Sequence, residues 1–112
     1  WSMDITHKLS DSVRVLGLAG RFDAHETQAV SAWFKEQTDA GNVHLVVNLS
    51  GVNFVDSTAL SALVQGLKHC REKGGNLHLC TLQQPVRVIF ELTRLDKAFS
   101  IFVTEDEAVK FQ

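Results

Sequence analysis

Residues 43–60 read VHLVVNLSGVNFVDSTAL and carry two structural signals within one short stretch. Val43–Leu49 is an almost unbroken apolar run of strand length, which is typical of a strand that is covered on both faces and central in its sheet. Over Asp56–Lys73, apolar residues recur at helical spacing, with Leu60, Leu63 and Leu67 on one side. The stretch therefore predicts a central strand that leads through a short loop into a helix.

Strand and helix signals alternate on both sides of this stretch. Before it, a turn at Ser10-Asp11 separates two strand-like runs, and Gly41 ends an amphipathic helix. After it, Gly74-Gly75 ends the helix, and Pro85 favours the first position of another. The remaining predicted elements are strands at Asp4–Leu9, Ser12–Gly20, Asn76–Leu82 and Phe99–Val103, and helices at Glu26–Ala40, from Pro85 through Leu95, and at Glu105–Phe111.

The order β-β-α-β-α-β-α-β-α predicts an α/β fold. Strands that alternate with helices are joined by crossovers and form a mainly parallel sheet, whereas the first two strands form an antiparallel hairpin. We therefore expect a mixed, mainly parallel sheet of four to five strands with about four helices. With 112 residues, 45% of them hydrophobic, the chain is expected to form one domain over residues 3–112. Trp1 and Ser2 precede Met3 and are interpreted as a cloning remnant.

Composition argues against several classes of function. Eleven basic and thirteen acidic residues give a net charge of −2, so no electrostatic footprint for nucleic acid is expected. No apolar run approaches the roughly 20 residues of a membrane span, and no secretory leader is recognisable. The two cysteines, Cys70 and Cys80, form no disulfide framework, which favours a reducing cytoplasm.

The junction between the central strand and the following helix holds the main candidate site. Asp56 and Ser57 stand where the helix is expected to begin, and side-chain oxygens there accept hydrogen bonds from free backbone N–H groups. Either residue could therefore be only a helix cap. Ser57 also lies at the carboxyl end of the strand, however, and ligands and partners bind at that edge in open α/β sheets.

The same residues carry a resemblance to a known family. Phe54-Val55-Asp56-Ser57-Thr58-Ala59-Leu60 after an apolar strand resembles the phosphorylation loop of STAS domains, in particular of bacterial anti-sigma factor antagonists. Three other segments resemble family features in the right order: the turn before the first helix, a helix-to-strand turn, and the third helix with its following loop. These segments are Leu18–Ala24, Lys73–Leu77 and Val86–Phe99.

The resemblance implies a binding switch without catalysis by this chain and without a cofactor. The unphosphorylated form would bind an anti-sigma factor, itself a serine kinase of the GHKL type, and so release sigma. Phosphorylation of Ser57 would end binding, and a cognate phosphatase would restore it; Thr58 is a second candidate acceptor. The residues implied in partner binding are Asp23, Asn53, Asp56, Ser57, Thr58 and Ala59.

Two positions depart from the family pattern. Ala59 stands where the family commonly has Gly, and it could narrow the approach of a partner or kinase. Asn48 stands where the family commonly has Asp, which removes a negative charge that we expect just under the loop. The oligomeric state is left undetermined by the sequence.

Other functional classes give weaker matches. A STAS subunit of a transport assembly, either a phospholipid-transport ABC complex or an anion transporter, is the main alternative, although such subunits often lack the serine at position 57. A stressosome-like scaffold would normally carry a further sensor domain. The glycines form no nucleotide-binding motif, and Ser57 with His25 lacks the GxSxG context of a hydrolase.

The remaining histidines and aromatic residues are assigned structural roles. His78 and Cys80 share a strand face with His44 nearby, yet a closed zinc site needs four ligands, and none is clustered. Trp33 and Phe34 are adjacent on one helix, so at most one of them points inward. We expect Trp33 in the core and Phe34 half-exposed at its edge.

Overall fold

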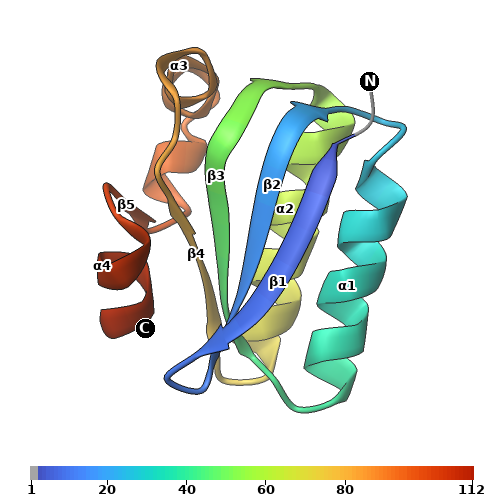
Figure 1. The fold of residues 1–112 in the computed structure, drawn as a ribbon, viewed down its shortest axis with the longest axis vertical. Coiled ribbons are helices and arrows are strands. Elements are labelled where there is room, and N and C mark those ends of the chain that lie inside the picture. Colours follow the sequence, from blue (N-terminus) through green and yellow to red (C-terminus); the bar gives the residue numbers. More distant parts are fainter. Residues whose placement is uncertain (1–2) are drawn as a thin grey trace.

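A single five-stranded sheet with the strand order β1-β2-β3-β4-β5 organises the computed structural model, which describes residues 3–112 (Figure 1). The α/β fold and the order of its elements are confirmed. The strands are β1 (Asp4–Ser10), β2 (Val13–Phe22), β3 (His44–Val55), β4 (Asn76–Cys80) and β5 (Ile101–Phe102). The helices are α1 (Thr27–Asp39), α2 (Ser57–Glu72), α3 (Gln84–Leu92) and α4 (Glu105–Lys110), with a 3-10 turn, η1, at Leu95–Lys97.

One antiparallel hairpin begins the sheet, and all later pairings are parallel. β1 pairs antiparallel with β2 in an unbroken register from Asp4↔Ala19 to Ser10↔Val13. The two residues between the strands, Asp11 and Ser12, have φ values of 50° and 70°. Positive φ at both central residues is the mark of the type I′ turn, whose twist matches that of a hairpin.

β3 is the central strand, as its apolar sequence predicts. Its side chains alternate between the two faces of the sheet. Leu45, Val47 and Leu49 enter the main core, to which α1, α2 and α3 contribute, whereas Val46 enters a smaller cluster beneath α4. All four side chains are fully buried.

β2 and β3 both run further than predicted. β3 continues past Leu49 to Val55, through two register irregularities against β2. A Cβ on Gly51 would lie 2.5 Å from the Cβ of Ala19, so only glycine lets the two strands approach there. The extension brings the end of β3 to within two residues of Ser57.

The assignment of the aromatic pair on α1 was wrong. Phe34 is only 1% exposed, and Trp33 lies partly buried at the edge of the core. The reason is on α2, where a Cβ at Gly66 would lie 2.6 Å from the Phe34 ring. The missing side chain at Gly66 leaves the space that the ring fills, so α1 turns Phe34 rather than Trp33 toward the sheet.

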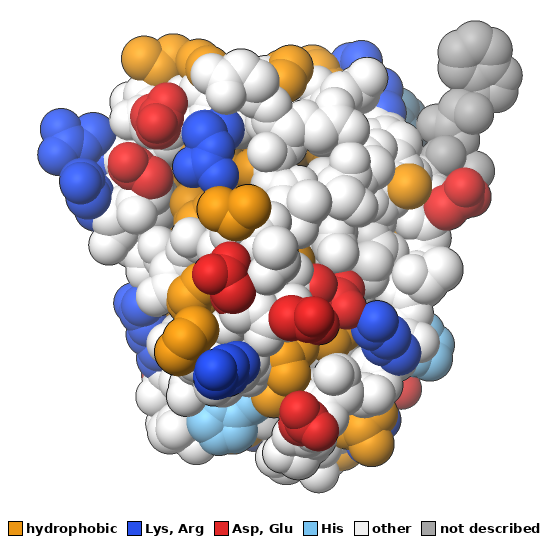
Figure 2. Space-filling model, turned by 60° about the vertical axis from the view of Figure 1, so that its left-hand side comes forward, with side chains coloured by type: hydrophobic (Ala, Val, Ile, Leu, Met, Phe, Trp, Pro, Cys, Tyr) orange, Lys and Arg blue, Asp and Glu red, His pale blue; other side chains and the backbone are white. Residues whose placement is uncertain are grey.

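Two C-terminal strands are shorter than predicted. β4 ends at Cys80 because Thr81 has a φ of 59°, which breaks the extended backbone. β5 has only two residues. On the side of the molecule that carries α3 and α4, charges of both signs are interspersed with single apolar side chains (Figure 2). No helix within residues 3–112 combines the length and apolar character that crossing a bilayer requires.

Candidate partner-binding site at the start of helix α2

The candidate site lies where parallel strands end and α2 begins, at the upper end of the sheet (Figure 1). Two neighbouring loops are joined there by one backbone–backbone and one backbone–side-chain hydrogen bond. The N–H of Asp56 donates to the carbonyl of Phe22 over 3.3 Å, and the N–H of Ala24 donates to Oδ2 of Asp56 over 2.9 Å. The loop after β2 and the loop after β3 therefore form one continuous surface.

Asp56 is the residue that caps α2. Its backbone is extended, with φ −104° and ψ −179°, and its Oδ1 accepts from the N–H of Ala59 and from Oγ1 of Thr58. The hydrogen bond from Thr58, together with those from the N–H groups of Ala59 and Ala24, lowers the pKa of Asp56. The capping role is thus confirmed for Asp56, and Ser57 is the first residue of the helix.

Ser57 and Thr58 differ although both are exposed. The Thr58 hydroxyl donates to Oδ1 of Asp56 over 2.7 Å. Among residues 3–112, the Ser57 hydroxyl takes part in no such side-chain hydrogen bond. A hydroxyl that receives a phosphate must be free to approach the phosphorus atom. The geometry therefore favours Ser57 over Thr58 as the phosphate acceptor.

Asp23 lies half-buried in the loop after β2 and organises that loop. Its carboxylate accepts from the backbone N–H of His25 over 3.0 Å and from Nε of Arg21 over 3.1 Å. The His25 ring nitrogen Nδ1 lies 3.4 Å from Oδ1 of Asp23. Asp23 therefore holds His25 within the loop after β2.

Arg21 and Phe54 form a feature of this surface that the sequence analysis missed. The guanidinium carbon of Arg21 lies 3.6 Å from the centre of the Phe54 ring, in a cation–π stack. The two residues are paired across β2 and β3. No pattern along the chain shows this pairing, because it depends on the register shift between Gly20 and Arg21.

Asn53 and Ala59 differ in what they offer a partner. Asn53 is exposed near the end of β3. Ala59 is fully buried in the main core, so its methyl group has no surface to present. The expectation that Ala59 contacts a partner or narrows its approach is corrected accordingly: the side chain packs inward because the first turn of α2 rests on the sheet.

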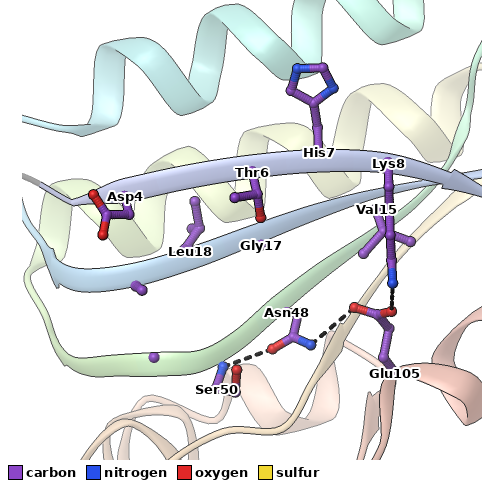
Figure 3. A pocket seen from close by; sticks show the side chains of 12 residues that line it. Asp4, Thr6, His7, Lys8, Val15, Gly17, Leu18, Asn48, Ser50 and Glu105 are labelled. Atoms are coloured by element: carbon purple, nitrogen blue, oxygen red, sulfur yellow. Dashed lines mark hydrogen bonds and ion pairs between the residues drawn. The ribbon is translucent and has the colours of Figure 1, made fainter.

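Asn48 lies away from the Ser57 loop, on the opposite face of the sheet. Its Nδ2 donates to Oε1 of Glu105 over 3.0 Å, and its Oδ1 accepts from the N–H of Ser50 over 2.9 Å. Glu105 also forms a 2.7 Å ion pair with Lys8 (Figure 3). Burial acts to raise the pKa of Glu105, but the hydrogen bonds from Lys8 and Asn48 outweigh it and lower the pKa.

These side chains border a shallow hollow of about 370 Å³ on the uncovered face of β1, β2 and β3 (Figure 3). The hollow exists because small residues, Gly17, Ala19 and Gly51, stand side by side on that face. Asn48 was predicted to lie just under the Ser57 loop. That position is wrong, because Asn48 bonds to Glu105 and so joins the sheet to α4.

His78 and the two cysteines are structural. His78 is 3% exposed, its Nδ1 lies 3.1 Å from the carbonyl of Ala108, and burial lowers the pKa of its imidazole. Burial raises the pKa of both thiols, Cys70 and Cys80, to about 11, which makes them poor nucleophiles. In the part of the chain that the structure describes, no three His, Cys, Asp or Glu side chains gather as a metal site would need.

Comparison with known proteins agrees with the α/β fold and the order of its elements. The family model described as "STAS domain" matches residues 4–108. The chain belongs to the STAS domain family.

Similar STAS proteins have names that refer to sigma-factor control. The anti-sigma F factor antagonist of Paenibacillus polymyxa is 26% identical over 98 residues, covering 87% of this chain and 84% of the relative. The anti-sigma-B factor antagonist of Listeria monocytogenes is 26% identical over 106 residues, covering 95% and 92%. The crystal structure of an anti-sigma factor antagonist from Mycobacterium paratuberculosis superposes with a TM-score of 0.87 at 25% identity, covering 97% and 92%.

The STAS fold is also shared with transport proteins. A sulfate transporter family protein from Wolinella succinogenes superposes with a TM-score of 0.73 at 17% identity, covering 93% of this chain and 87% of that one. A likeness at this level of identity concerns the fold alone.

Proposed function

We propose that this STAS domain is an anti-sigma factor antagonist whose binding is controlled at Ser57. In the unphosphorylated state, the surface around the start of α2 binds an anti-sigma factor and so releases sigma. The observation that carries this proposal is the exposed hydroxyl of Ser57, which makes no side-chain hydrogen bond within residues 3–112, at the first position of a 16-residue helix. The names of the similar proteins support the general role.

A phosphate on Ser57 is compatible with the fold. It adds about −1.5 to −2 charges at neutral pH and stands at the helix end where the dipole is positive. Asp56 repels the phosphate, but the Asp56 oxygens already accept hydrogen bonds from Ala24, Thr58 and Ala59. The folded domain therefore accommodates the modification in place.

The effect of the phosphate on a bound partner is the reverse. Binding strips water from the surface around Ser57, and a doubly charged group that loses its water without gaining a matching cation costs several kcal/mol. Each 1.4 kcal/mol changes an affinity by a factor of ten. The switch thus acts through local charge, with little change in shape.

The proposed contact surface combines both loops and the strand end. The proposal includes Asp23, Asn53, Asp56, Ser57 and Thr58, and we extend it to Arg21 and Phe54 because their stack lies beside these residues. The proposed partner is an anti-sigma factor that is also a serine kinase of the GHKL type, with a separate phosphatase that removes the phosphate. The chain itself binds and is modified without catalysing a reaction, and the proposed setting is the cytoplasm.

The main alternative is a role as the STAS subunit of a transport assembly. The fold likeness to a sulfate transporter family protein is compatible with either role, because it carries no residue-level information. The exposed Ser57 hydroxyl, next to a capping carboxylate, favours the phosphorylation switch.

Phosphorylation with a candidate kinase tests the proposal. We would incubate the chain with ATP and the anti-sigma serine kinase encoded nearest to its gene, and analyse the peptides by mass spectrometry. We expect one phosphate within residues 53–63, lost in Ser57→Ala and retained in Thr58→Ala. Phosphate on Thr58 alone would contradict the assignment. So would a peptide without phosphate when the same kinase preparation phosphorylates a known antagonist substrate.

A further inference from the structure

The outer edge of β1 is a second surface of interest, separate from the Ser57 site. Within residues 3–112, β1 pairs with β2 only and forms one edge of the sheet. Asp4 through Leu9 are all exposed. The backbone groups of β1 that point away from β2 therefore have no strand partner in the described chain.

The hairpin geometry fixes which residues carry these free groups. A two-residue hairpin is closed by a pair that exchanges both backbone hydrogen bonds, which here is Ser10 with Val13. Since hydrogen-bonded and non-bonded pairs alternate, Lys8, Thr6 and Asp4 also bond to β2. The N–H and C=O groups of the intervening residues point outward; these residues are Ile5, His7 and Leu9.

The usual protections of an edge strand are absent from β1. Such edges are commonly blocked by proline, by a bulge, or by a charged side chain turned to the edge. β1 has no proline, and its register with β2 is unbroken over seven residues. Its single lysine, Lys8, is directed across the uncovered sheet face to Glu105 (Figure 3).

Exposed apolar side chains stand beside the free backbone groups. Ile5 is 36% exposed and Leu9 is 58% exposed. Both lie on the same side of the strand as His7, which points away from Thr6 and Lys8 (Figure 3). An edge that offers free amides together with exposed apolar side chains is suited to binding another strand.

We propose that β1 pairs antiparallel with β1 of a second copy of this chain, with His7 on the two-fold axis. This register is the one in which both strands overlap along their whole length and outward-facing residues meet outward-facing residues. Ile5 then lies opposite Leu9 of the second copy, and Leu9 lies opposite its Ile5. The two sheets join into one continuous sheet across an isologous interface.

The sequence of β1 is complementary to itself in this arrangement. On one side, the two Ile–Leu pairs cover each other's exposed apolar surface. On the other side, Thr6 lies opposite Lys8 of the second copy, and each Lys8 stays paired with Glu105 of its own chain. The match of Ile5 with Leu9 in this register favours a second copy over an unrelated strand.

The interface leaves the Ser57 site free. β1 pairs with β2 only as far as Ala19, and the site residues of β2 and its loop, Arg21 and Asp23, lie beyond that pair. The pairing therefore does not depend on the proposed function, and either proposal can fail alone.

The first test is the mass of the protein in solution. Multi-angle light scattering from micromolar to millimolar concentration should show a rise from the 12.4 kDa monomer toward twice that mass. Leu9→Lys should remain monomeric, whereas Leu92→Lys, which removes a 77% exposed leucine on α3, should behave like the parent chain. A parent chain that stays monomeric throughout, or an equal loss in both variants, would overturn the proposal.

The second test is the register, read by cysteine cross-linking. The native thiols Cys70 and Cys80 are buried, so an introduced surface cysteine reacts first. His7→Cys should form a disulfide-linked dimer, since residues on the axis have Cα atoms about 5.5 Å apart. Ile5→Cys alone should not, because the two copies of residue 5 are about 13 Å apart along the strands.

Mixing two variants completes the register test. Ile5→Cys mixed with Leu9→Cys should give the cross-linked heterodimer, whereas Ser12→Cys in the hairpin turn serves as the exposed control that does not cross-link. If Ile5→Cys links to itself as readily as His7→Cys, the proposed register is wrong. Circular dichroism of each variant verifies that the domain is folded.

Discussion

The start of α2 and the outer edge of β1 are both exposed, yet their polar groups are used in opposite ways. At the start of α2, Asp56 bonds to Ala24, Thr58 and Ala59, which leaves the Ser57 hydroxyl available on a fixed surface. Along β1, a whole row of backbone groups has no partner within the described chain. Under the proposed function, the first surface is switched by a single charge.

The comparison is tested most strongly by Ser57→Asp. A carboxylate at this position should weaken binding to the anti-sigma factor by roughly 100-fold, because a charge must be buried without a counter-ion. The melting temperature should move by less than about 2 °C, since a negative charge is favourable at a helix N-terminus. Isothermal titration calorimetry and a thermal melt measure the two quantities.

Matched variants sharpen this first prediction. Leu9→Lys, which changes only the β1 edge, should bind the anti-sigma factor with unchanged affinity. Ser57→Ala should also retain binding but lose phosphorylation. Equal affinities of Ser57→Asp and the parent chain would refute control by charge at this position.

Removal of the helix cap should give the next largest effect. Asp56→Ala deprives two backbone N–H groups, those of Ala24 and Ala59, of their acceptor. We expect the melting temperature to fall by roughly 5 °C. The melting temperature of Asp56→Asn, which retains a capping oxygen, should fall less. An unchanged melting temperature in Asp56→Ala would mean that the loops are held together by other contacts.

The pH dependence of stability follows from the lowered pKa of Asp56. A carboxyl whose folded pKa lies below its unfolded value of about 3.9 stabilises the fold above that value, and the contribution is lost as the pH falls through the folded pKa. The stability difference between the parent chain and Asp56→Asn should therefore shrink between about pH 5 and pH 2. Urea unfolding at several pH values measures it, with Asp11→Asn as the control for removing one carboxylate elsewhere.

The smallest effect is expected at Arg21. Arg21→Ala removes the stack on Phe54 and the bond to Asp23, both at the surface. Exposed cation–π pairs and ion pairs contribute little to stability, so the free energy of unfolding should change by no more than about 1 kcal/mol. If the stacked pair contacts the anti-sigma factor, the free energy of binding should change by more than the free energy of unfolding. Equal binding by Arg21→Ala would remove this pair from the proposed surface.

Local sequence patterns were sufficient for the type and order of the elements. The apolar run at Val43–Leu49 and the helical spacing after Asp56 depend on neighbours in the chain, and both were predicted correctly. The Asp56 cap was also available from the sequence, since an acid at a helix start has a local reason to be there.

Contacts between distant segments were beyond the sequence. β3 extends to Val55 because Gly51 meets Ala19, and Phe34 is buried because Gly66 leaves it space. The same limit applies to the stack of Arg21 on Phe54, which depends on a shifted register between two strands. In each case the cause lies far away along the chain.

The buried methyl group of Ala59 has a consequence for the divergence of such domains. The methyl group packs the first turn of α2 against the core. The backbone at position 57 is therefore held by the packing of Ala59 and not by the Ser57 side chain. Ser57 can then be replaced during evolution without repacking its neighbours. The scaffold would thereby stay intact if the proposed phosphorylation site were lost or regained.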